Sequence, residues 1–382
     1  SSVISEYLKK QIEEENKDCF QNSTEFDLNR QNGVNEQKIC KIIQKDDIDN
    51  FISHVSRTNL SLQTTIKRSI FETNLFLNSQ KSDITLIEYS AFYGSIQIFK
   101  YLYKNDIKLT PSLWLYSIHG RNPEIFSILI KNKIKPKDTS YKECIIEAIK
   151  CHHNEIVDYI NNNFCQHENN NQFINSISID YYNFSFLQSD IKYNESNFYK
   201  FCKYDYYFFI QQFIKNVSID INFRISDTIN NHEYLFTPLN VSIFYNNENI
   251  ALLLLEQSNI DPNIEMIKRK WGESEKSMNS LVLSIKIKKI KLVKQLLFCN
   301  NIDVNKFLSK TKYYGDSSSI SIIFSPLAFA IKNKQTKIVE LLLSYKNINL
   351  NSILNVTSPI IKHSALSLAM INYCIEIIKI LL

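Results

Sequence analysis

The side chains best suited to bind a metal ion gather in one stretch of the chain. Residues 144–167 carry three cysteines and three histidines, namely Cys144, Cys151, His152, His153, Cys165 and His167. Structural zinc sites usually combine C-x₂₋₄-C with H-x₃₋₅-H, whereas the close pairs here are Cys151-His152 and Cys165-x-His167. This spacing favours ordinary structural roles and predicts no metal. A zinc-binding or catalytic module around Cys151–His167 remains an alternative, which stoichiometric bound zinc would support.

The sequence lacks the motifs of nucleophilic and phosphate chemistry. It contains no G-x-S-x-G, no P-loop, no G-x-G-x-x-G and no H-E-x-x-H motif. Only 5 of its 382 residues are glycine, which makes a loop that surrounds a phosphate hard to build. We therefore predict a protein that is not an enzyme, with no catalytic residues, no cofactor and no small-molecule ligand.

Basic side chains concentrate in a second stretch. Residues 265–294 contain nine Lys or Arg and three Glu, a local balance of +6 against +5 for the whole chain. The predicted partner-binding residues are Lys268, Arg269, Lys270, Trp271, Lys286, Lys288 and Lys289. Trp and Arg are typical of interface hot spots. A solvated face is the more common fate of such a charged stretch, and an acidic protein surface is the partner that its charge would suit. Nucleic acid is not expected, because it would require more aromatic residues stacked beside these charges.

A repeated phrase predicts the elements that hold these residues. It combines a Thr/Ser-Pro-Leu opening, a leucine-rich stretch and an Asp/Asn-x-Asn turn, at residues 237–239, 250–255 and 261–263 and again at 325–327, 338–343 and 349–351. Thr237 or Ser325 can cap a helix, and Pro238 or Pro326 suits its first position. Each unit is therefore predicted to be a helix, a tight turn and a second helix, stacked on copies of itself.

This unit resembles the ankyrin repeat. The Thr-Pro-Leu-His opening and the leucine-rich second helix of that repeat match residues 237–255 and 325–343. The usual His is replaced in four units, by Asn240, Val282, Ala328 and Leu366. Upstream, residues 85–102 form another unit, with Gly94 at the turn between helices, and Asp46-Asp47-Ile48 takes the turn of an opening unit. The resemblance implies an all-α fold, an ankyrin-type helical solenoid of stacked helix-turn-helix repeats with variable finger loops.

A second resemblance covers the segment from Lys41 to Ile160. Residues 112–116 and 149–154 make it similar to the domain of unknown function that precedes ankyrin repeats in large protein families of flagellated protists. In the ankyrin register, Cys144 and Cys151 lie on a first helix, while His152 and His153 occupy the turn. Trp114 is expected to pack in the core or on the concave face.

Spacings between equivalent second-helix positions show where the units vary. The positions are Ile98, Ile125, Ile156, Ile250, Leu292, Ile338 and Ile377, separated by 27, 31, 94, 42, 46 and 39 residues, against about 33 in a regular ankyrin array. The long spacings predict enlarged fingers at 264–278, 306–324 and 352–362. The 94-residue gap predicts two degenerate units around Phe186 and Phe209. Fourteen Phe and Tyr between Tyr181 and Phe213 either fill these units or form an exposed docking surface.

The sequence therefore predicts that the chain has four segments. Residues 1–35 form a polar N-terminal helix or tail, 36–160 a degenerate ankyrin-like domain, 161–235 degenerate aromatic-rich repeats, and 236–382 ankyrin repeats with enlarged fingers. Because a leucine stripe ends uncapped at Leu382, we expect the natural chain to continue or a partner to cover the stripe.

The expected role is that of a non-catalytic scaffold or adaptor that binds protein partners through its concave face and fingers. The alternative is a permanent structural component of a cytoskeletal or axonemal assembly, with an acidic filament surface as the partner. The eight scattered cysteines indicate reduced thiols, and no apolar run approaches the ~20 residues of a membrane span. The predicted location is therefore cytoplasmic, with or without association with the cytoskeleton.

Overall fold

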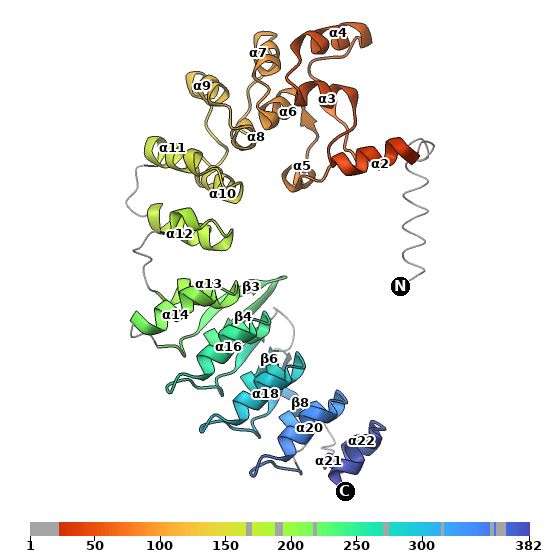
Figure 1. Cartoon of the computed structure of the whole chain (residues 1–382), viewed down its shortest axis with the longest axis vertical. Helices are drawn as coiled ribbons and strands as arrows, with labels where there is room; N and C mark the ends of the chain where they lie inside the picture. Colours follow the sequence, from red (N-terminus) through yellow and green to blue (C-terminus); the bar gives the residue numbers. More distant parts are fainter. Residues whose placement is uncertain are drawn as a thin grey trace. The chain divides into compact units, whose positions relative to one another are not determined.

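The computed structural model describes residues 23–165, 170–187, 194–216, 220–269, 275–314, 317–351, 355–356 and 364–382. The chain divides after Leu187 into two compact parts, called here unit 1 and unit 2 (Figure 1). The described residues are mostly helical and include two antiparallel sheets, one of two strands and one of seven. None of the described helices has both the length and the apolar character that crossing a membrane requires.

Unit 1 holds two rows of helices. The first row is α3 (Lys38–Gln44), α6 (Leu86–Tyr93), α8 (Leu113–Gly120), α10 (Lys142–Lys150) and α12 (Asn170–Asp180), each packed on the next. The second row is α4 (Ile48–Thr58), α7 (Ile96–Lys104), α9 (Pro123–Lys131) and α11 (Asn154–Phe164), each packed on the first-row helix before it. The remaining elements are α2 (Ser23–Asn32), β1 (Thr65–Ile66), α5 (Leu75–Ser79), β2 (Ile84–Thr85) and the 3₁₀ helix η1 (Phe184–Phe186).

Unit 2 repeats this arrangement and adds a sheet (Figure 1). Its first row is α13 (Glu195–Lys203), α15 (Pro238–Phe244), α17 (Ser280–Lys286), α19 (Pro326–Lys332) and α21 (Ala365–Ile371). Its second row is α14 (Tyr207–Asn216), α16 (Glu248–Leu255), α18 (Ile290–Leu297), α20 (Thr336–Leu343) and α22 (Ile375–Leu381). The strands are β3 (Ile225–Ile229), β4 (His232–Phe236), β5 (Met266–Arg269), β6 (Glu275–Met278), β7 (Leu308–Tyr314), β8 (Ser317–Phe324) and β9 (Asn355–Val356).

Capping residues start the first-row helices of unit 2 where the sequence predicts. The Thr237 hydroxyl accepts a 3.2 Å hydrogen bond from the backbone N–H of Asn240, and the Ser325 hydroxyl accepts one of 3.1 Å from Ala328. A proline follows each cap at the start of the helix. These contacts satisfy backbone donors that the first turn leaves free, and they confirm the predicted helix starts.

Leucines of the second row face the core. Leu254 of α16, Leu296 of α18 and Leu342 of α20 are fully buried. Burial of each such side chain contributes about 1.5–3 kcal/mol. The predicted leucine stripe therefore holds one helix pair to the next.

The seven-stranded sheet corrects the expectation of an all-α chain. Its strands lie in sequence order, β3 to β9, and every neighbouring pair is antiparallel. The predicted fingers 264–278 and 306–324 hold the hairpins β5–β6 and β7–β8, and β6 also pairs with β7. A finger alone leaves backbone donors and acceptors without partners, and pairing with the next finger satisfies them. Most of the third finger, 352–362, lies outside the described residues.

The described aromatic residues include both buried and exposed side chains. Trp114 is fully buried and donates its indole N–H to the Ile134 carbonyl at 2.8 Å, which confirms its core position. In the aromatic stretch Phe198, Phe201 and Phe213 are fully buried, whereas the exposed members are Tyr181, Tyr182, Phe184, Tyr207 and Phe208.

Only one of the two degenerate units expected around Phe186 and Phe209 corresponds to a helix pair. Phe209 lies in the pair α13–α14, but Phe186 lies in η1 rather than in a helix pair. The N-terminal segment 1–35 is described from residue 23 onward, where α2 begins.

Gly120 permits the close approach of α6 and α8. A Cβ atom at Gly120 would lie 2.1 Å from the Ala91 carbonyl oxygen and 2.6 Å from the Gly94 nitrogen. Both neighbours are backbone atoms, so neither can move without displacing a helix. We expect Gly120→Ala to lower the free energy of unfolding by about 3 kcal/mol. Urea unfolding followed by circular dichroism measures the change.

The matched control is Ser127→Ala on the exposed side of α9, which should alter stability by less than about 0.5 kcal/mol. If both alanine variants unfold at the same urea concentration as the wild type, the close crossing is wrong.

Candidate functional site

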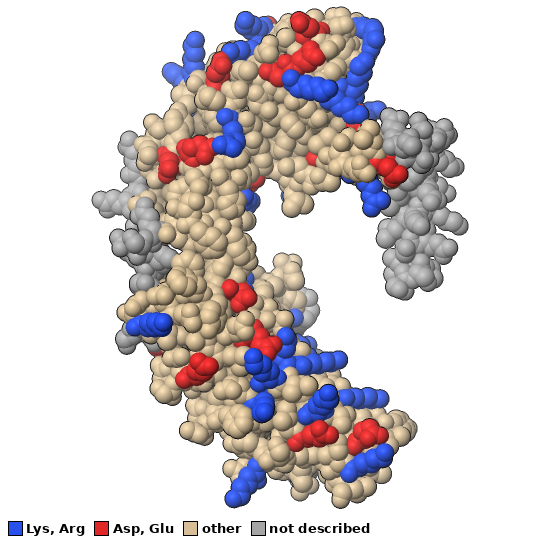
Figure 2. All heavy atoms as spheres, viewed as in Figure 1, with Lys and Arg blue, Asp and Glu red and all other residues tan. Residues whose placement is uncertain are grey.

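Two of the predicted partner-binding residues are neutralised within unit 2. The Arg269 guanidinium lies 2.8 Å from a carboxylate oxygen of Glu275, and the Lys289 ammonium lies 3.0 Å from one of Glu248. On the face of unit 2 drawn in Figure 2, Lys and Arg side chains lie among Asp and Glu side chains. The basic stretch therefore does not form one continuous basic surface there.

Three other predicted residues are Lys288, Lys270 and Trp271. Lys288 is exposed in the turn between α17 and α18, where its φ of 61° is left-handed. Lys270 and Trp271 lie outside the described residues, so their expected role at the finger tip stays a prediction.

Strand pairing brings Lys268 beside a lysine that the sequence analysis did not select. Lys268 of β5 is paired directly with Lys276 of β6, and with Tyr234 of β4 on its other side. Directly paired residues of antiparallel strands project from the same face of a sheet. The Lys268 ammonium lies 5.4 Å from the centre of the Tyr234 ring, a cation–π contact. Like charges placed opposite each other destabilise a sheet, so this arrangement carries a cost.

Lys286 joins this pair from the neighbouring helix. It is the last residue of α17, which packs against β6. Lys286 is exposed, but partial desolvation of its ammonium, followed by the charges of Lys268 and Lys276, lowers its pKa below the usual range. Among the described residues, no acidic side chain pairs with any of the three. We call Lys268, Lys276 and Lys286 the lysine corner.

The equivalent position at α13 shows how the chain neutralises such a lysine elsewhere. Lys203 ends α13 as Lys286 ends α17, and its ammonium lies 2.7 Å from a carboxylate oxygen of Asp227. The Tyr199 hydroxyl donates to the same oxygen at 2.8 Å. Burial acts to lower the pKa of Lys203, but the hydrogen bond to Asp227 and nearby charges raise it overall. Asp227 lies in the cross-strand row of Tyr234, Lys268 and Lys276, so the row is acidic at β3 and basic at β5 and β6.

The predicted cysteine and histidine cluster is dispersed. Cys144 is fully buried, and the Cys165 thiol lies 3.6 Å from the Ser140 carbonyl oxygen. His152 and His153 occupy the turn between α10 and α11, as predicted. His167 lies outside the described residues.

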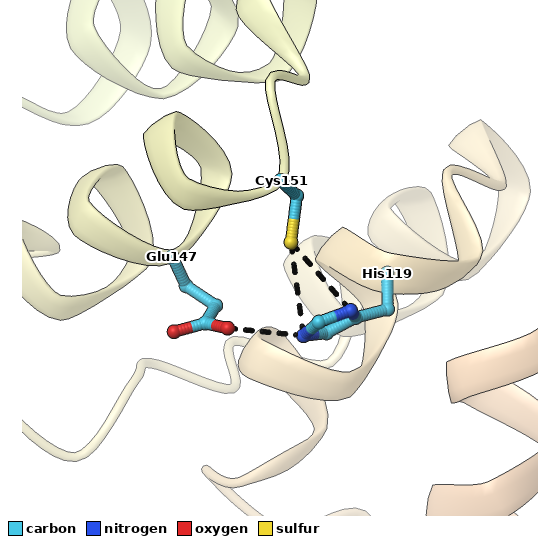
Figure 3. Close-up of side chains that lie close together, drawn as sticks. All are labelled: His119, Glu147 and Cys151. Atoms are coloured by element: carbon cyan, nitrogen blue, oxygen red, sulfur yellow. Dashed lines mark hydrogen bonds and ion pairs between the residues drawn. The ribbon is translucent and has the colours of Figure 1, made fainter. Parts of the chain in front are cut away.

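Cys151 instead meets two residues that the sequence analysis did not select. Its Sγ lies 3.6 Å from Nδ1 and 3.9 Å from Nε2 of His119, and the same Nε2 lies 3.1 Å from Oε1 of Glu147. Figure 3 shows the sulfur and the carboxylate directed at the imidazole ring. His119 and Glu147 are separated by 28 residues and become neighbours only because α8 packs on α10.

This arrangement is poorly suited to nucleophilic catalysis. A catalytic cysteine is activated by one ring nitrogen in line with the thiol, but the Cys151 sulfur is nearly equidistant from both nitrogens. Burial and the Glu147 charge raise the pKa of Cys151 to about 11, so the thiol stays protonated at neutral pH. For Glu147, burial opposes ionisation, but His119 and Lys150 lower its pKa overall.

Comparison with known proteins supplies no family for this chain. No protein-family model matches the sequence, and no curated protein matches it either.

The two helix-end lysines should respond oppositely to removal of their charge. Lys203→Met leaves the partly buried Asp227 without its cation, and we expect the free energy of unfolding to fall by about 1–2 kcal/mol. Lys286→Met removes a charge that its neighbours repel, and we expect a rise of up to about 1 kcal/mol. Urea unfolding at neutral pH tests both variants.

The effect of Lys286→Met on the free energy of unfolding should depend on pH. The charge of Lys286 lowers the free energy of unfolding, because the pKa of this lysine is lower in the folded protein than in the unfolded chain. This loss of stability is complete below the folded pKa and disappears as pH rises to the usual lysine range. The advantage of Lys286→Met should therefore shrink at alkaline pH. A loss of stability in both variants at neutral pH would contradict the unneutralised lysine corner.

Proposed function

We propose that this chain is a non-catalytic ankyrin-type scaffold that binds an acidic segment of a protein partner. The partner segment lies between the first-row helices and the sheet of unit 2, over the lysine corner. The finer description of the fold, an ankyrin-type helical solenoid with finger hairpins, belongs to the same proposal. It is supported by helix pairs that pack in chain order and by the Thr/Ser-Pro-Leu helix starts.

The lysine corner is the observation that carries the functional proposal. The charges of Lys268 and Lys276 act on Lys286, and no acidic side chain of the described residues forms an ion pair with any of the three, although an equivalent lysine of the same unit has such a partner. An acidic partner supplies the missing charge and relieves the repulsion between the lysines. Tyr234 beneath Lys268 is buried, and its ring stacks on Phe236 at 5.3 Å, which gives the site a rigid base.

An extended segment suits this surface best. In an extended chain every second side chain projects to the same side. A segment with alternating acidic residues therefore presents several carboxylates to lysines spread over β5, β6 and α17. The cytoplasmic location and the association with a cytoskeletal filament remain proposals of the same kind, since such filaments carry acidic surfaces.

Binding of a labelled peptide tests the proposal. The probe is a fluorescein-labelled peptide of alternating Glu and Ser, and fluorescence anisotropy with the full chain measures its affinity. We expect the double variant Lys268→Glu/Lys276→Glu to weaken binding about tenfold or more, because it replaces two attractions by two repulsions. Added salt should weaken binding to the wild type, because exposed charges are screened.

The matched control makes the same change of charge away from the corner. It is the double variant Lys337→Glu/Lys346→Glu, at two exposed positions on and after α20. The proposal requires that this control bind the peptide more tightly than the corner variant does. Equal affinities of the two double variants, or equal affinity of the wild type for a Gln/Ser peptide, would overturn it.

A further inference from the structure

Three side chains able to bind a metal converge between neighbouring first-row helices of unit 1. His119 lies in the last turn of α8, Glu147 lies in the last turn of α10, and Cys151 follows α10 directly with a near-helical backbone. Residues four apart share one face of a helix, so the carboxylate and the thiol of α10 both reach toward the imidazole (Figure 3). One ligand atom from each residue can be chosen so that all three lie within 4.8 Å of one another.

The distances suit one small ion. A tetrahedral zinc ion has bonds of about 2.0–2.3 Å to nitrogen, oxygen and sulfur, which places its ligand atoms about 3.3–3.6 Å apart. The observed separations are 3.1 Å from Nε2 to Oε1 and 3.9 Å from Nε2 to Sγ. Binding of one ion by all three atoms therefore requires the Cys151 side chain to turn so that Sγ moves toward Nε2.

The surroundings hold the imidazole and one carboxylate oxygen in place. The His119 ring lies 4.3 Å from the Phe76 ring and 4.8 Å from the Phe92 ring, between centres. Lys150 holds Oε2 of Glu147 at 3.2 Å, which leaves Oε1 directed at His119. The side chains of His119 and Glu147 keep only 13% and 15% of their surface exposed. Ligands fixed in this way lose little freedom when an ion binds.

We infer that His119, Glu147 and Cys151 bind a divalent transition-metal ion of the zinc class through Nε2, Oε1 and Sγ. A thiolate and an imidazole select zinc or cobalt over magnesium and calcium, and three protein ligands leave the fourth position for water. The ion replaces the proton of the thiol, which passes to solvent, and the imidazole binds through Nε2 as the neutral tautomer with its proton on Nδ1. This site shares only Cys151 with the zinc alternative drawn from the sequence, and it is independent of the peptide-binding proposal for unit 2.

Cobalt binding tests the site in the full chain. The protein is treated with a chelator, desalted under reducing conditions and titrated with Co²⁺. We expect one equivalent to produce the sulfur-to-cobalt charge-transfer absorption and the visible bands of a four-coordinate ion. Zn²⁺ should then displace the cobalt and abolish both signals.

Variants assign the signal to these residues. Cys151→Ser and His119→Gln nearly preserve the side-chain shapes and should weaken cobalt binding about tenfold or more, since loss of outer partners alone costs 10–100-fold. Cys299→Ser, a half-buried thiol of unit 2, is the matched control and should bind as the wild type does. The inference is overturned if no charge-transfer band appears, or if Cys151→Ser keeps the wild-type spectrum and affinity. If His119→Gln unfolds by circular dichroism, the isosteric Cys151→Ser decides.

Discussion

A left-handed residue in the turn of each helix pair is the constraint on which the two rows depend. In the described part of the chain nine pairs have one, at Asp46, Gly94, Arg121, His152, Asp205, Asn246, Lys288, Lys334 and Tyr373. In most of these turns the next residue donates its N–H to a carbonyl five positions back, as Ser95 does to Ser90 at 2.9 Å. This closes the end of the first helix and reverses the chain within three residues. Within each unit, every first-row helix therefore meets the next first-row helix, and the sheet of unit 2 continues along one row.

The helix pairs could be predicted, because their signals are local. Caps such as Thr237 and apolar stripes such as the one around Leu254 lie within one turn of the elements they specify. The left-handed turn residues could not be recognised by type, since only Gly94 of the nine is glycine. Such a backbone costs about 1 kcal/mol or more for other residues, and packing of the two helices offsets it. The sheet escaped prediction because its pairing joins different fingers, so no single segment of polar sequence specifies it.

The residues of the two candidate sites could likewise be predicted only where the local sequence identifies them. Composition alone identified Lys268 and Lys286, but Lys276 joins them only through the register of β5 and β6. The carboxylate of Glu248 that neutralises Lys289 lies 41 residues away in sequence. Likewise, spacing directed attention to the cysteines and histidines near Cys151, whereas its actual neighbour, His119, comes from the preceding helix pair. In a stacked chain, the partner of a side chain is set by the repeat spacing more than by the nearby sequence.

No acidic side chain of the described residues forms an ion pair with the three lysines of the corner, and the pKa of Lys286 reports how strongly their charges act on one another. Heteronuclear NMR of the full chain, with selectively labelled lysine, can follow the titration of this ammonium in the wild type and in Lys268→Met. We expect a pKa of Lys286 below the usual lysine range that rises toward this range in the variant. A pKa in the usual range that does not respond to the substitution would contradict the repulsion between these lysines.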